Sequence, residues 1–169
     1  GRKFARCIQE QLCWLCGQKY NINRQAFVIG PMCSINRVSS EPAQHKDCSL
    51  YAVQACPFLS RPHAHRREAG LPEDGQNPGG VMLTRNPGAS AVWITRESHP
   101  FNAGNGVLVQ LGEPSEVLWF AEGRKATRAE VVASVESGIP LLRAQCRTIQ
   151  EHIQLKAMTE RAYRYFPHT

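Results

Sequence analysis

Long apolar runs are missing from this chain of 169 residues. No stretch approaches the roughly 20 consecutive apolar residues that a membrane-spanning helix needs. The first residues also lack the hydrophobic segment of a secretory signal. Hydrophobic residues make up 42% of the chain and charged residues 20%, which are ordinary values for a globular protein. We therefore expect a cytoplasmic protein without a membrane partner.

Sequence motifs of known reactions are scarce as well. The glycine-containing loop at 98–106 is long and polar enough to form a site. No Gly-Lys-Ser/Thr follows it, so it does not read as a phosphate-binding loop. No set of nucleophile, base and acid stands out elsewhere in the chain. These absences favour a binding protein over an enzyme and leave catalysis an open question.

Cysteine is abundant, with seven residues. An odd number that includes a Cys-x-x-Cys pair indicates metal binding in a reducing compartment rather than a disulfide scaffold. Cys13 and Cys16 form one pair with metal-ligand spacing, and His45 and Cys48 form another. Because Zn²⁺ prefers thiolate and imidazole ligands in a tetrahedron, these four residues predict one structural zinc ion. Gly17 supplies the turn that lets backbone amides approach the thiolates.

Two alternatives for the metal remain open. Cys33 could replace His45 as a ligand. An iron–sulfur cluster could also form, although His45 favours zinc. The four cysteines of such a cluster would be Cys13, Cys16, Cys48 and Cys56. The remaining cysteines, Cys7 and Cys146, fit the role of small buried hydrophobic residues.

The segment between the two ligand pairs predicts a fold. Residues 26–29 are a β-prone run, Gly30 and Pro31 signal a turn, and residues 32–38 can return as a second strand. From His45 the apolar residues recur with helical spacing up to Cys56. The order of knuckle, hairpin and helix resembles the treble-clef zinc-finger superfamily over residues 11–58. The resemblance implies that Cys13 and Cys16 lie on the knuckle, with His45 and Cys48 on the helix, all as ligands. There is also a faint similarity to uncharacterised bacterial and phage zinc-binding proteins.

Nucleases of the HNH type also contain treble clefs. The resemblance implies a histidine general base at the end of the hairpin, with an asparagine and a second histidine aligned on a catalytic metal. Here the hairpin offers Asn36 but no histidine, while His63 and His65 fall in a later loop. A complete set of four ligands also leaves no open coordination position for catalysis. A metal-dependent nuclease therefore ranks third among the functions considered.

Positive charge is concentrated in the cysteine-rich half. Residues 1–67 hold ten Lys/Arg and three Asp/Glu, a net charge of +7, whereas residues 68–169 hold ten and eleven, a net charge of −1. Such a basic half could meet nucleic-acid phosphates if folding gathers the cations on one face. The candidate phosphate contacts are Lys19, Arg24, Arg37, Lys46, Arg61, Arg66 and Arg67.

The composition predicts an α+β fold in two units. A zinc module at 1–62 precedes a linker at 63–80, which is rich in proline and glycine. The second unit, 81–169, begins with a four-stranded antiparallel meander whose aromatic residues Trp93, Trp119 and Phe120 belong to the core. The expected strands are 81–85, 91–95, 107–111 and 116–121.

Two helices are expected to close the chain. Thr127 and Glu130 form a capping box, and Gly138 ends that helix. Pro140 is placed to start a long amphipathic helix that continues to about Tyr163. This helix could cover the sheet or pair with a partner helix. The cations Arg124, Lys125 and Arg128 stand at the unfavourable end of the first helix, which hints that they face a ligand.

Two functions from different classes rank ahead of the nuclease. The first is a zinc-stabilised binding module that contacts nucleic acid through its basic half, with an affinity that falls steeply with salt. The second is a protein-interaction factor, of the accessory or inhibitory kind found in bacteria and phages. It predicts a stable protein complex and only weak nucleic-acid binding.

Overall fold

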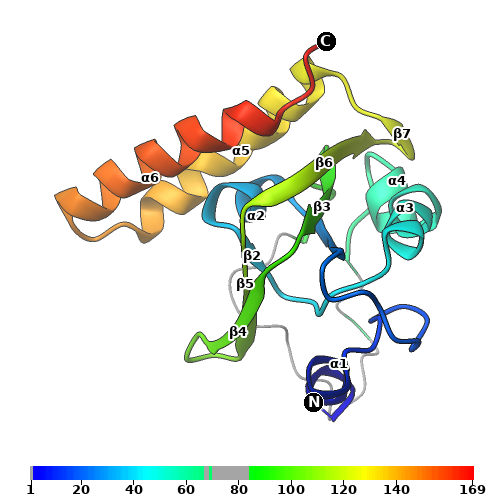
Figure 1. Ribbon diagram of the computed structural model, residues 1–169. Helices are drawn as coiled ribbons and strands as arrows, with labels where there is room; N and C mark the ends of the chain where they lie inside the picture. The colour runs from blue at the N-terminus through cyan, green and yellow to red at the C-terminus, as the bar shows by residue number, and fades with distance from the viewer. Residues whose placement is uncertain (1, 67–68, 70–83) are drawn as a thin grey trace.

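A computed structural model describes residues 2–66, 69 and 84–169. It is a mixed helix-and-sheet structure with antiparallel strands, in which a central sheet lies between two sets of helices (Figure 1). The helices are α1 (Arg2–Glu10), α2 (Pro31–Asn36), α3 (Lys46–Ala55), α4 (Pro57–Ser60), α5 (Arg128–Gln145) and α6 (Ile149–Ala162), followed by a 3₁₀ turn, Tyr163–Tyr165. The strands are β1 (Gln25–Ile29), β2 (Val38–Ser39), β3 (Ser90–Thr95), β4 (Ser98–Asn102), β5 (Val107–Leu111), β6 (Pro114–Ala121) and β7 (Arg124–Lys125).

The central sheet has the strand order β1-β3-β6-β7. Phe27 lies opposite Trp93, which in turn lies opposite Val117. Strand β1 comes from the predicted zinc module and β3 from the predicted second unit, so the two stretches share one sheet. The expected linker at 63–80 lies mostly outside the described residues.

Each face of this sheet is covered by different helices. Side chains alternate along the strands, so one set packs against α3, where Val53 is buried with Val92 and Phe120. The opposite face carries Trp93 and Trp119 and packs against α2, α5 and the C-terminal segment. The expectation that Trp93, Trp119 and Phe120 are core residues is confirmed.

The predicted return strand at 32–38 is wrong. Residues 31–36 form helix α2 instead, with Pro31 in its first turn and Arg37 ending it in a left-handed conformation, φ 55°. Proline has the φ angle that a helix start needs and lacks only an amide hydrogen that would have no helical partner there. Because β1 pairs with β3, the hairpin on which the nuclease resemblance depended does not form between 26–29 and 32–38.

The predicted four-stranded meander is also wrong. Strand β3 pairs with β1 and β6, while β5 belongs to a second sheet of order β2-β5-β4. Most of the expected strand 81–85 lies outside the described residues, and Arg85 forms a bridge with His65. The polar loop at 98–106 is mostly β4 and a turn, in which Asn102 accepts a hydrogen bond from the amide of Gly104 at 2.8 Å.

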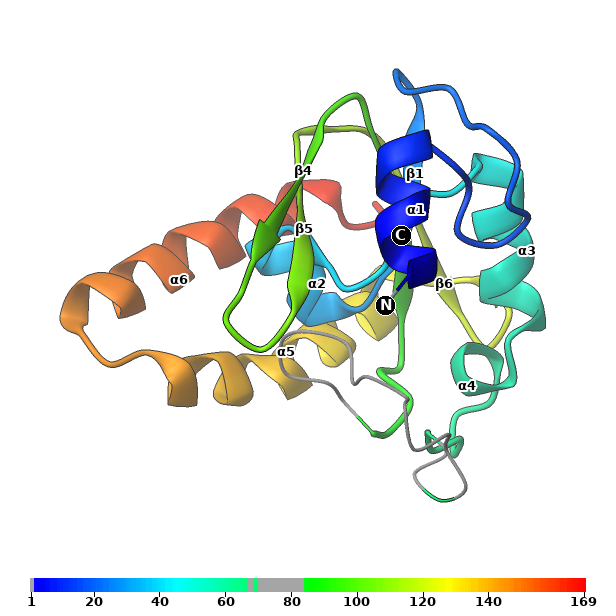
Figure 2. The same ribbon diagram turned by 90° about the horizontal axis from the view of Figure 1, so that it is seen from below.

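The boundary between the two C-terminal helices lies further along the chain than expected. Helix α5 runs through Gly138 and Pro140 to Gln145, and α6 starts at Ile149 behind a second capping box. Gly138 is needed because α2 lies so close: a Cβ there would approach Met32 Cγ to 2.7 Å. The capping box of Thr127 and Glu130 is confirmed. Figure 2 shows α5 and α6 as the two arms of a hairpin that opens towards the rest of the molecule, where α2 lies between them.

Candidate metal centre

The first ligand pair lies on a tight knuckle between α1 and β1. Cys13 donates its amide to the Gln18 carbonyl at 2.8 Å, and Gly17 donates to the Cys13 carbonyl at 2.9 Å. Gly17 has φ 73°, which glycine adopts without steric cost. Helix α1 supports the knuckle through edge contact between the rings of Phe4 and Trp14, whose centroids are 6.4 Å apart.

The second pair is brought to the knuckle by a short extended segment. Ala26 and Gln44 exchange two backbone hydrogen bonds, of 3.1 and 2.8 Å, and Trp14 donates its amide to the Ala43 carbonyl at 3.1 Å. The next residue, His45, is the N-cap of α3, which places Cys48 on the first turn of that helix. Strand β1 and the knuckle therefore hold the start of α3 between them.

The four predicted ligands meet at one place. The ligand atoms of Cys13, Cys16, His45 and Cys48 all lie within 4.8 Å of one another. Cys16 Sγ is 3.3 Å from His45 Nδ1, and Cys48 Sγ is 3.8 Å from the same nitrogen. In a tetrahedral site with metal–ligand bonds of about 2.0–2.3 Å, neighbouring ligand atoms stand about 3.5–3.8 Å apart. The cluster therefore has the size to hold one metal ion.

The imidazole of His45 is oriented for this purpose. Its Nε2 lies 3.0 Å from the Lys19 carbonyl oxygen, which can only accept a hydrogen bond. Nε2 therefore carries the proton, and the Nδ1 lone pair is directed at the sulfur atoms. A histidine ligand commonly donates its second ring nitrogen to a carbonyl in this way, because the bond fixes both the tautomer and the ring.

The thiols are electrostatically unequal. Burial opposes ionisation of Cys13, but the amides of Cys16, His45 and Leu15 point at its sulfur and lower its pKa to about 7. Burial, together with the neighbouring sulfur atoms of Cys13 and Cys16, raises the pKa of Cys48 to about 12. Three thiolates cannot accumulate here without a positive charge between them, and a metal cation supplies that charge.

Neither alternative ligand joins the cluster. Cys33 lies on α2 and Cys56 follows α3, and both line a separate pocket beside Phe58 and Leu59. Burial raises the pKa of the Cys33 thiol to about 11, as expected for an inert buried side chain. Within the part of the chain that the structure describes, Cys13, Cys16, His45 and Cys48 form the one group of this kind.

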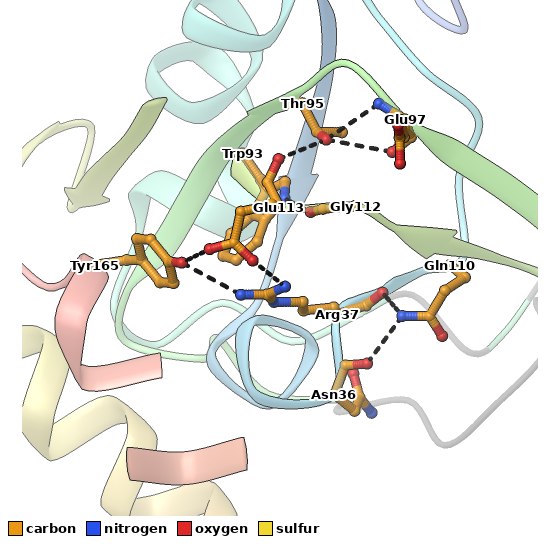
Figure 3. Close-up of polar contacts among 9 residues, drawn as sticks. All are labelled: Asn36, Arg37, Trp93, Thr95, Glu97, Gln110, Gly112, Glu113 and Tyr165. Carbon is orange, nitrogen blue, oxygen red and sulfur yellow. Dashed lines mark hydrogen bonds and ion pairs between the residues drawn. The ribbon is translucent and has the colours of Figure 1, made fainter. Parts of the chain in front are cut away.

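The predicted phosphate contacts differ in their surroundings. Arg37 is only 7% exposed, and its guanidinium donates to Glu113 Oε2 at 2.7 Å and to the Tyr165 hydroxyl at 3.3 Å (Figure 3). Tyr165 also donates to Glu113, and the guanidinium lies 5.5 Å from the centroid of the Trp93 ring. Arg37 is thus held inside the fold by its own partners, which argues against its prediction as a phosphate contact.

The other cations separate into paired and exposed groups. Lys46 donates to both carboxylate oxygens of Glu116, at 2.9 and 2.7 Å. Arg67 lies outside the described residues. The exposed cations are Lys19, Arg24, Arg61 and Arg66. The first two belong to the segment around the knuckle, and the last two follow α4.

A second group of cations lines a groove that sequence reasoning missed. The groove has a volume of about 930 Å³ and runs along β6, between the start of α3 and the segment after the 3₁₀ turn. Its basic side chains are Lys46, Arg124, Lys125, Arg164 and His168. Lys46 was already a candidate phosphate contact, and Arg124 with Lys125 stood out because cations at a helix start are unusual. Arg164 and His168 gave none.

Comparisons with protein-family models, curated proteins and solved structures yield no match. Among the helices of the described residues, none combines the length and apolar character required to cross a membrane.

Proposed function

We propose that the protein is a zinc-stabilised binding module whose partner is another protein. The observation that supports the zinc ion is the convergence of one imidazole and three sulfur atoms within 4.8 Å. Three thiolates and one neutral imidazole favour Zn²⁺ over the harder cations, and four protein ligands make a closed, structural site. The knuckle and the helix that bears the second ligand pair support the resemblance to a treble clef, although the hairpin of that motif is absent between 26–29 and 32–38.

The role of the ion is to fix helix α3. Its first turn carries Cys48 and is preceded by His45, and the helix covers one face of the central sheet with Val53 and Leu50. Without the ion, the crowded thiols would be protonated, and the knuckle and the start of α3 would no longer be held together. Because α3 also forms one wall of the groove along β6, the ion stabilises a surface as well as a core.

The test of the zinc site is metal content together with stability. Elemental mass spectrometry should find one equivalent of zinc in the purified protein. Removal of zinc by a chelator should lower the thermal unfolding midpoint sharply. Re-addition of Zn²⁺ should restore it. Protein that is folded and metal-free, with the same midpoint after chelation, would contradict the proposal.

A protein partner is favoured by the open strand edge along the groove, which is described below. Nucleic acid is the second candidate, since Lys19 and Arg24 are exposed beside the knuckle. The two are separated by fluorescence anisotropy of labelled DNA and RNA, as single strands and duplexes, across a salt series. Micromolar binding with a steep salt slope that weakens in a Lys19→Ala, Arg24→Ala variant would establish nucleic acid as the partner.

A further inference from the structure

Strand β6 has a free edge. Strand β3 pairs with it from Ser90 opposite Phe120 down to Thr95 opposite Pro114. On its other side, β7 pairs only with Phe120 and Ala121. Within the described part of the chain, no strand occupies the side of β6 below β7. Such an edge presents unpaired backbone donors and acceptors that can pair with another strand.

The direction of the free backbone groups follows from one hydrogen bond. Ala126 donates its amide to the Trp119 carbonyl at 2.9 Å, so the backbone of Trp119 points away from β3. Residues two apart in an antiparallel strand point the same way, so Val117 also directs its N–H and C=O to the free edge. Among the described residues, β7 pairs with β6 only at Phe120 and Ala121, so no strand lies opposite Val117 on this side.

The edge lies at the bottom of the groove. One wall is α3, with Lys46, Leu50 and Gln54, and the other is the C-terminal segment around Arg164 and His168. The walls belong to opposite faces of the sheet, since Leu118 packs towards α3 and Trp119 towards the C-terminal segment. The groove therefore follows the line that an added strand would take, in continuation of β7.

The charge of the groove indicates the character of that strand. Its lining includes four Lys/Arg side chains but only one carboxylate, Glu116. Lys46 is paired with Glu116, and Arg124 is paired with Glu130 at 2.6 Å. Lys125 and Arg164 have no carboxylate partner among the residues that the structure describes. Their charges are free to meet an acidic ligand.

We propose that the free edge of β6 binds an extended acidic peptide segment of a protein partner, which adds a strand next to Val117 with its carboxylates near Lys125 and Arg164. Main-chain hydrogen bonds supply the affinity of such strand addition, and side-chain complementarity supplies the specificity. A peptide of about six residues covers the edge at about 3.3 Å per residue. This inference rests on the proposed function, in which zinc fixes the α3 wall.

The experiment is a titration of the zinc-loaded, full-length protein, followed by the amide signals of its ¹⁵N spectrum. The probe is the hexapeptide Val-Glu-Glu-Val-Glu-Glu, whose neighbouring glutamates point to opposite faces of an added strand and so towards both walls. The first control probe replaces glutamate by lysine. The second carries N-methyl groups on alternate amides, which removes half of its main-chain donors. We expect the acidic probe to shift the amides of Val117, Trp119 and Lys125, and both control probes to bind at least about tenfold more weakly.

Two variants locate the binding. Arg164→Glu combined with Lys125→Glu should reverse the preference, so that the lysine probe binds more tightly than the glutamate probe. Lys156→Glu combined with Arg143→Glu makes the same charge change on exposed positions of the α5–α6 hairpin and should leave both affinities unchanged. Val117→Pro should abolish binding while keeping the β3 pairing, because its missing N–H is the one that faces outward.

The outcomes are distinct. Absence of shifts at the β6 edge up to about 1 mM peptide, the weak limit of specific recognition, overturns the inference. The same holds if a single-stranded oligonucleotide shifts those amides at lower concentration than the acidic peptide, since the groove then serves phosphates. Zinc content and unfolding are measured on the same sample. A protein without zinc, or with unfolding that does not depend on zinc, refutes the zinc-stabilised module. Absence of amide shifts at the β6 edge in zinc-loaded protein refutes only the peptide site.

Discussion

Two polar clusters join distant parts of this chain, and their charges are balanced in different ways. The metal-ligand cluster of Cys13, Cys16, His45 and Cys48 brings together groups that repel one another when ionised. The cluster around Arg37 joins α2 to the C-terminal segment through Glu113 and Tyr165, whose charges and hydrogen bonds complement each other. The first needs an added cation, whereas the second is complete within the protein.

The difference separates a site from a structural link. A buried charge that finds its counter-charge, as Arg37 does, has no capacity left for a ligand. A crowded set of acidic donors without a counter-charge, such as the three thiols, cannot ionise completely unless a cation binds between them. Charge balance inside the fold therefore distinguishes a residue that could bind something from one that holds the structure together.

The largest effect is expected from breaking the metal-ligand cluster. Cys16→Ser should lose the bound zinc and lower the free energy of unfolding by about 5 kcal/mol or more, since structural zinc supplies on the order of 10 kcal/mol in small modules. Trp14 packs against Phe4 beside the knuckle, so tryptophan fluorescence should report the loss. Zinc content and urea unfolding measure the two consequences.

Cys56→Ser is the matched control for this prediction. Cys56 is a partly buried thiol at the end of α3 and lies outside the metal-ligand cluster. The variant should retain one equivalent of zinc, with a stability close to that of the parent. Equal zinc loss in both variants would show that the ligand assignment is wrong.

A smaller effect is expected at the Arg37 cluster. Arg37→Met keeps much of the side-chain volume but removes the charge that Glu113 and Tyr165 contact. We expect a loss of about 2 kcal/mol in unfolding free energy, below the range for a fully buried pair because the Glu113 side chain is 66% exposed. Zinc content should stay at one equivalent.

The double variant Arg37→Met, Glu113→Gln isolates the pair. If Arg37 acts through Glu113, the combined loss should be smaller than the sum of the two single losses. Additive losses would show that the stacking of the guanidinium near Trp93 carries the stabilisation instead. Loss of zinc from Arg37→Met would show that the metal-ligand cluster depends on the Arg37 cluster.

The metal-ligand cluster was predictable because its signal is local. Two residues three positions apart can bind one ion whatever connects the pairs, so the spacing of Cys13 with Cys16 and of His45 with Cys48 carried the information. Strands 91–95, 107–111 and 116–121 appear as β3, β5 and β6 for the same reason, since a short apolar run marks a strand.

Strand pairing and charge pairing were not predictable, because both depend on distant residues. The run at 32–38 is compatible with a strand, but Pro31 starts a helix whose Ile35 is buried in the core. Local turn signals suggested hairpins, yet β3 takes β1 as its neighbour from 60 or so residues earlier in the chain. Nothing near Arg37 in the sequence indicates that Glu113 will neutralise it.

The smallest effect on the free energy of unfolding is expected at the exposed ion pair of Arg124 and Glu130. Its size can be compared with the effect at the more buried pair of Arg37 and Glu113. Arg124 and the Thr127 amide hold the pKa of Glu130 at about 2, below the ordinary value near 4.3. A lowered folded-state pKa means that the stabilisation is complete above about pH 5 and is lost as the pH falls towards 2. Glu130→Gln should therefore cost about 0.5 kcal/mol at pH 6, as exposed pairs and caps do, and progressively less below pH 4.

The measurement is the difference in urea midpoint between Glu130→Gln and the parent at each pH, so that any acid-induced zinc loss common to both proteins cancels. Arg37→Met serves as the comparison at pH 6 and should show the larger deficit, because its guanidinium is buried. A Glu130→Gln deficit that equals that of Arg37→Met at pH 6 would show that burial adds nothing to the Arg37 pair. A Glu130→Gln deficit that grows on acidification would contradict the lowered pKa of Glu130.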